Sequence, residues 1–165
     1  MKARIKAFIT LAVILSACSS LSSATGSDTK ADDFEGIAAL IESGNFQFTV
    51  RSASPSGGRT VQITSSYVMK ASEGTYEARL PYFGRVYSGG YGDGGSVEFK
   101  GEPENLEITR NDKKKRISLK FSIKSASEKY DVKLEVSKSG YGNLVVSSPK
   151  RQTISYRGLV SGLED

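Results

Sequence analysis

Few side chains in this sequence can carry out catalysis or bind a metal. Its 165 residues include no histidine and a single cysteine, Cys18. Without histidine the usual Ser-His-Asp and Cys-His arrangements are excluded, and the commonest zinc ligand is missing. A pair of carboxylates could still hydrolyse a glycosidic bond, and Glu73 and Glu77 would share one face of a strand. Exposed charges on an antiparallel strand give the same pattern. We therefore expect that the protein is not an enzyme and that it binds no metal and no other cofactor.

The cysteine follows a segment with the features of an export signal. Lys2, Arg4 and Lys6 make the start of the chain positive, and none of the first 17 residues is acidic. The apolar run after them, residues 7–15, is too short for a membrane-spanning helix, which needs roughly 20 apolar residues. A positive start and a short apolar run that ends in small residues are typical of a signal peptide. We therefore expect residues 1–17 to be removed during export.

The residues around the expected cut resemble a lipidation motif. Leu15-Ser16-Ala17-Cys18 is similar to the lipobox of bacterial lipoproteins. The resemblance implies that diacylglycerol is joined to the sulfur of Cys18 and that acyl chains anchor the protein to a membrane. An ordinary secretory signal, cut for instance after Ala24, is the alternative. Residues 19–23 lack the acidic residues that mark some lipoproteins for the cell surface, so we expect an outer-membrane protein that faces the periplasm.

The charge of the processed chain is nearly balanced. Removal of residues 1–17 takes away three of the 23 Lys and Arg and none of the 18 Asp and Glu, so 20 basic residues face 18 acidic ones. The densest basic run, residues 110–116, holds no aromatic side chain that could stack on a base. We interpret this run as a solvated hairpin tip, with contact to anionic lipid headgroups or polysaccharide as the alternative. We expect no nucleic acid partner, because that would need a concentrated basic face.

The most unusual segment is residues 80–95, which hold four aromatic residues, one arginine and six glycines. In one interpretation the glycines supply the positive φ angles of turns and bulges, and the aromatic side chains plug one end of the core. In the other, aromatic faces stack on a sugar, peptide or lipid, and the arginine pairs with an anionic group. The candidate ligand-binding residues are Tyr82, Phe83, Arg85, Tyr87 and Tyr91.

One amphipathic helix is predicted before the strands. Phe34, Ile37, Ala38 and Ile41 recur at the spacing of one helical face, which predicts a helix at about residues 32–43. We expect it to cover one face or end of a sheet, and a helix that binds a partner is the alternative. Ahead of it, residues 18–31 are mostly small and polar and read as a flexible tether.

The rest of the chain alternates with a period of two. Ile117, Leu119, Phe121 and Ile123, for example, are separated by serines and lysines, a pattern that puts every second side chain on the same face. The sequence predicts a mainly β domain, residues 32–165, of about nine antiparallel strands in a meander, built as a half-open barrel or as a sandwich. The expected strands are residues 46–53, 59–70, 75–81, 96–100, 105–110, 115–124, 129–137, 142–148 and 152–158.

Three segments together resemble a known family of small bacterial lipoproteins. They are Gly57-Gly58-Arg59 with Ile63-Thr64-Ser65-Ser66-Tyr67, then Leu80-Pro81-Tyr82-Phe83-Gly84-Arg85-Val86-Tyr87, and last Arg151-Gln152-Thr153-Ile154-Ser155-Tyr156-Arg157-Gly158. The chain resembles the family of domain of unknown function 4251 over about residues 34–160. The resemblance implies a small, mostly β, envelope-associated domain, and it assigns no activity and no site residue.

These observations favour a non-catalytic module of the periplasm that binds a ligand or takes part in assembly. Its partners would be the membrane, through the lipid anchor, and an envelope protein, a glycan or a small apolar ligand. A second hypothesis is a structural or chaperone-like envelope protein that uses a sheet edge or an apolar patch. The third is a hydrolase with two carboxylates that face each other across a cleft.

Overall fold

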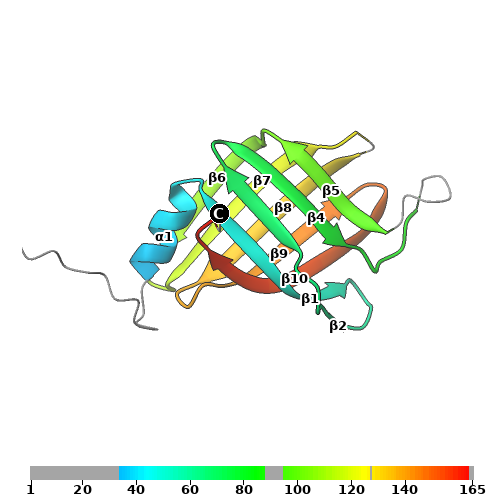
Figure 1. Cartoon of the computed structure of the whole chain (residues 1–165), viewed down its shortest axis with the longest axis horizontal. Coiled ribbons are helices and arrows are strands. Elements are labelled where there is room, and N and C mark those ends of the chain that lie inside the picture. Colours follow the sequence, from blue (N-terminus) through cyan, green and yellow to red (C-terminus); the bar gives the residue numbers. More distant parts are fainter. Residues whose placement is uncertain (1–33, 88–94, 127, 164–165) are drawn as a thin grey trace, which may run out of the picture.

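The computed structural model describes residues 34–87, 95–126 and 128–163, which form one helix and a strongly curled antiparallel sheet (Figure 1). This confirms the mainly β fold. The predicted helix is α1 (Phe34–Glu42), and residues 32 and 33 lie outside the described residues. The strands are β1 (Phe46–Pro55), β2 (Val61–Gln62), β3 (Val68–Ser72), β4 (Thr75–Pro81), β5 (Ser96–Gly101), β6 (Glu104–Asn111), β7 (Arg116–Lys124), β8 (Lys129–Ser137), β9 (Tyr141–Ser148) and β10 (Arg151–Ser161).

The sheet is a half-barrel whose first and last long strands are paired. Nine strands follow the order β5-β4-β3-β1-β10-β9-β8-β7-β6, and β2 pairs with β1 beside this path. With β2 set aside, strands that are consecutive in sequence are neighbours except at the β5–β6 connection, so the predicted meander is confirmed. The opening lies between β5 and β6, although the two strands are joined only by residues 102–103.

Aromatic side chains fill the concave side of the half-barrel. The alternating residues of β7 are buried as predicted, from Ile117 to Ile123. Across the opening Phe99 of β5 lies edge-on to Phe121 of β7, with ring centroids 6.3 Å apart, and the Tyr76 ring lies 4.6 Å from Phe121. Each buried large apolar side chain contributes roughly 1.5–3 kcal/mol to folding. The interior is therefore a packed core.

Helix α1 closes one end of the half-barrel (Figure 1). Phe34, Ala38 and Ile41 are buried, and the Arg110 guanidinium lies 5.0 Å from the centre of the Phe34 ring. Gly44, with a φ of 70°, ends the helix in the left-handed conformation that favours glycine. Nine residues are too few to span a bilayer, and no helix in the described part of the chain is long and apolar enough to cross a membrane.

The predicted strand 59–70 is wrong in one respect, because the structure divides it into β2 and β3. The amide of Ile63 donates to the carbonyl of Arg51, and the amide of Val50 donates to the carbonyl of Tyr67, each at 2.9 Å. Val50 and Arg51 are neighbours in β1, but the residues that they bond to, Tyr67 and Ile63, are four positions apart in the sequence. The residues between them leave the sheet, and β1 shifts its register against β10 at the same place. We call residues 63–67 the excursion.

Candidate functional site

The start of the unusual segment is fastened to the end of the half-barrel opposite α1. Its backbone pairs with the beginning of β10: the amide of Gln152 donates to the carbonyl of Arg85 at 2.8 Å, and the amide of Tyr87 donates to the carbonyl of Lys150 at 2.7 Å. Val86 forms an isolated antiparallel bridge with Arg151. We call residues 82–87 the strap. These bonds tie the backbone of the strap to the start of β10.

The buried side chain of Tyr82 links the strap to β10. Its hydroxyl lies 2.8 Å from the carbonyl oxygens of both Arg85 and Gln152 and shares its one proton between them. Its side chain is buried, with the Arg151 guanidinium 5.0 Å from the ring centre, and this burial raises the pKa of the phenol. A side chain at Gly84 would come within 2.5 Å of that hydroxyl. Tyr82, predicted to bind a ligand, is thus part of the core.

A buried ion pair lies under the strap. Arg151 and Glu128 form it with side chains only 6% and 2% exposed. Glu128 also accepts hydrogen bonds from Ser148 and, at 2.8 Å, from Tyr130, while Arg151 donates to the carbonyl of Ser96 at 2.7 Å. Burial alone raises the pKa of Glu128, but the bonds from Ser148, Tyr130 and Arg151 together outweigh it and hold that pKa below its usual range. The pair joins β5, β9 and β10.

Other side chains of the strap face water. Phe83 is 45% exposed, Val86 37% and Tyr87 66%, and Arg85 is exposed beside them. We call these four residues the distal patch. Three of the five predicted ligand-binding residues therefore belong to it, while Tyr91 lies outside the described residues. Val86 was not among the predicted residues, and only its place between Arg85 and Tyr87 could have indicated it.

The distal patch and α1 lie at opposite ends of the molecule (Figure 1). Ile37 of α1 packs beside Gly140, in the turn before β9, whereas the strap pairs with residues that follow the end of β9. Since β9 has eight residues and a strand rises about 3.3 Å per residue, roughly 25 Å separate the two ends. Cys18 and the predicted tether lie outside the described residues, and the described chain begins at α1, far from the distal patch.

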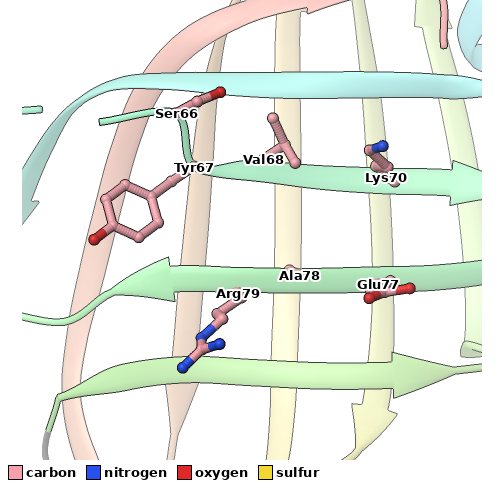
Figure 2. A pocket seen from close by; sticks show the side chains of 7 residues that line it. All are labelled: Ser66, Tyr67, Val68, Lys70, Glu77, Ala78 and Arg79. Carbon is pink, nitrogen blue, oxygen red and sulfur yellow. The ribbon is translucent and has the colours of Figure 1, made fainter. Parts of the chain in front are cut away.

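A groove runs across the convex face of the sheet where the excursion leaves it. It consists of two adjoining depressions of about 510 and 660 Å³ that share Ser66, Val68 and Lys70. Figure 2 shows the first of them, with the Tyr67 ring and Arg79 towards one end and Lys70 and Glu77 towards the other. The lining of the whole groove is Gln47, Thr49, Val50, Arg51, Ile63, Thr64, Ser65, Ser66, Tyr67, Val68, Lys70, Glu77, Ala78, Arg79, Leu159 and Ser161. Sequence reasoning missed this groove because an excursion gives no signal in an alternating pattern.

The structure gives the carboxylate-pair hypothesis no support. Glu73 lies in the tight turn between β3 and β4 with a φ of 49°, and so does not share a strand face with Glu77 as predicted. Glu77 pairs instead with Lys100 at 2.8 Å. Each of the three surface depressions described is lined by at most one acidic residue. Among the described residues, no three His, Cys, Asp or Glu side chains gather as metal ligands would.

The edge strand β6 is the most exposed strand. None of its eight residues is buried, and Leu106 and Ile108, which face the concave side opposite the core residues of β7, remain 43% and 38% exposed. Asn105 has a φ of 54°, and the register against β7 shifts there. Such a bulge twists a sheet edge and hinders pairing with another strand. The uninterrupted part of the free edge therefore runs from Leu106 to Asn111.

Comparison with known proteins identifies relatives by fold and family. Residues 28–160 match the family model of a domain of unknown function, DUF4251. The fold is similar to the crystal structure of a DUF4251 family protein from Bacteroides eggerthii DSM 20697, with a TM-score of 0.62. The similarity covers 78% of this chain and 87% of the other at 14% identity, so it shows a shared fold alone. No curated protein matches the chain.

Proposed function

The chain belongs to the DUF4251 family, and from this premise we propose that it is a non-catalytic binding module of the bacterial envelope. A lipid on Cys18 anchors it to the outer membrane on the periplasmic side, and the distal patch binds a partner protein. The observation that carries the proposal is the strap, because its exposed aromatic side chains stand on a backbone fixed by hydrogen bonds to β10.

The anchor and the distal patch fit together geometrically. Between Cys18 and α1 lie residues 19–33, which span at most roughly 50 Å when fully extended. They join the domain at α1, at the end opposite the distal patch. With α1 towards the membrane, the distal patch points into the periplasm. A partner there would meet it before any other part of the domain.

The composition of the distal patch suits protein recognition. Aromatic and arginine side chains supply most of the binding energy at protein interfaces, because they bury large areas and arginine also forms directed hydrogen bonds. Phe83, Tyr87 and Arg85 provide both kinds of contact. Because the strap is already held by the buried Tyr82 and by Gln152, little backbone entropy is lost on binding.

Site-specific photocrosslinking in the native host tests the proposal. A photoreactive phenylalanine analogue replaces Tyr87 in one strain and Tyr141 in another, since Tyr141 is similarly exposed, at 62% against 66%, but lies at the α1 end. We expect a discrete cross-linked partner from position 87 and none from position 141. The band should disappear when Phe83→Ser is added. Equal products from both positions, or none from position 87, would reject the distal patch as a docking site.

A second candidate function is assembly through the free edge of β6. The exposed Leu106 and Ile108 favour it, because an added strand would cover both side chains and pair with the edge backbone. The same experiment separates the two functions. A photoreactive residue in place of Thr109, an exposed residue of β6, would give the cross-link instead of position 87 if the edge were the docking surface.

A further inference from the structure

We propose that the groove on the convex face is a second binding site and that its ligand is an acidic oligosaccharide. The site is separate from the distal patch, since it is built from the excursion and from residues of β1, β3, β4 and β10. Three properties of the groove carry the inference: its shape, its charge and its chemical lining.

The shape suits an extended ligand. The two depressions adjoin at Ser66, Val68 and Lys70 and together cross four neighbouring strands. Both are partly open to solvent, whereas a small molecule is usually held in a concave pocket that buries most of its surface. A chain of sugars lying along the sheet would contact both depressions and leave its ends free.

The described lining of the groove is positive, because it holds three cations, Arg51, Lys70 and Arg79, and one acidic residue, Glu77. Glu77 lies opposite Lys70 in the β3–β4 register, yet its carboxylate pairs with Lys100 on the other side. Arg79 is likewise held by Glu98 at 3.0 Å. Among the described residues, neither Lys70 nor Arg51 takes part in an ion pair. Both can therefore meet carboxylates of a ligand without first breaking a protein contact.

The lining supplies an aromatic face and many hydroxyl groups. Tyr67 is half-buried against the core, which fixes its ring, and its hydroxyl makes no hydrogen bond to any other described residue. The excursion adds hydroxyl groups at Thr64, Ser65 and Ser66, and Thr49 of β1 adds another. An aromatic face that packs on the apolar face of a sugar ring, surrounded by donors and acceptors for its hydroxyls, matches a carbohydrate better than a peptide.

Calorimetric titration of the processed chain in detergent tests the site. The probe is hexagalacturonate, with uncharged cellohexaose and a thymidine oligonucleotide as comparisons. We expect hexagalacturonate to bind at least tenfold more tightly than cellohexaose, with an affinity that falls as salt rises. Replacing Lys70 or Arg51 by glutamine should weaken binding about two- to fivefold each. Tyr67→Ala should weaken it about two- to tenfold, whereas Tyr67→Phe should retain most of the affinity.

Lys120→Gln is the control, because Lys120 is likewise an exposed lysine, on strand β7, where its ammonium group lies 3.9 Å from the exposed carboxylate of Glu107. Equal weakening by Lys70→Gln and Lys120→Gln would show diffuse electrostatic attraction and overturn the site. So would oligonucleotide binding as tight as that of hexagalacturonate, or no binding of hexagalacturonate at all. Cross-linking from position 87 is unaffected by these groove variants if the two sites are independent, so either proposal can fail alone.

Discussion

Replacing Arg151 should destabilise the domain more than replacing any exposed cation. Arg151 and Glu128 are almost completely removed from water. Removing one partner of a buried ion pair costs about 3–5 kcal/mol, because the other charge is left buried without compensation. Arg151→Met keeps most of the volume and the packing on Tyr82, so we expect its effect to come mainly from the charge. The free energy of unfolding should fall by about 3–5 kcal/mol.

Urea denaturation followed by circular dichroism measures this loss. Glu128→Gln should lower the free energy of unfolding by a similar amount. The double variant leaves no buried charge, so its loss should be at least about 2 kcal/mol smaller than the sum of the two single losses. Arg79→Met is the control: its ion pair with Glu98 is exposed, and such pairs contribute about 0–1 kcal/mol. A loss below about 1 kcal/mol for Arg151→Met, or additive single effects, would refute the role of the buried pair.

The same pair predicts how stability depends on pH. The pKa of Glu128 is lower in the folded protein than in the unfolded chain, because its hydrogen bonds and Arg151 outweigh the opposing effect of burial. A lowered carboxyl pKa contributes stability that is fully present above the unfolded value, about 4.5, and is lost as the pH falls through the folded value. The stability difference between the native protein and Glu128→Gln should therefore shrink below about pH 4.5 and stay constant between pH 5 and 8.

Three further predictions concern single positions. A methyl group at Gly158 would lie 2.1 Å from a backbone oxygen of β1, so Gly158→Ala should lower the urea midpoint strongly, whereas Gly162→Ala, with open space around it, should leave it unchanged. Two lysines that donate to Glu104 lower its pKa to about 2, and a carbon-detected NMR titration should show that pKa rising in Lys129→Met. Cys18→Ala should move the protein from the membrane fraction to the soluble fraction of its native host, and retention in the membrane would contradict lipid anchoring.

The alternation of apolar and polar residues was enough to predict most strands. Strands β4 and β7–β10 begin and end within three residues of the predicted bounds, because each has one face on the core and one in water. Alternation could not predict which strands pair with β1. The pairing of β1 with β10 joins residues more than 90 positions apart, and local patterns carry no information on which distant strand completes the sheet.

The chemistry of the unusual segment could be predicted only in part. The structural interpretation of residues 80–95 is confirmed for Tyr82, which plugs the end of the core, whereas Phe83 and Tyr87 are exposed, and the ligand-binding interpretation stays a prediction for them. Alternation fails in such a segment because its partner is a strand end about 70 residues away, and the bonds to Gln152 decide which side chains point inwards.

The segments on which the family resemblance rests meet at this end of the half-barrel. The side-chain oxygen of Gln152 accepts a hydrogen bond from the backbone amide of Arg85, and its side-chain nitrogen donates to the carbonyl of Ser56, next to the first of these segments. The backbone carbonyl of Gln152 accepts a hydrogen bond from the hydroxyl of Tyr82. The closure of this end of the half-barrel explains the tyrosine at position 82 and the glycine at position 84. It does not explain Phe83 or Tyr87, which touch water. If they serve only the fold, Phe83→Ser with Tyr87→Ser should destabilise the domain clearly. We expect a change within about 1 kcal/mol, because both side chains are largely exposed, as the proposed docking surface requires.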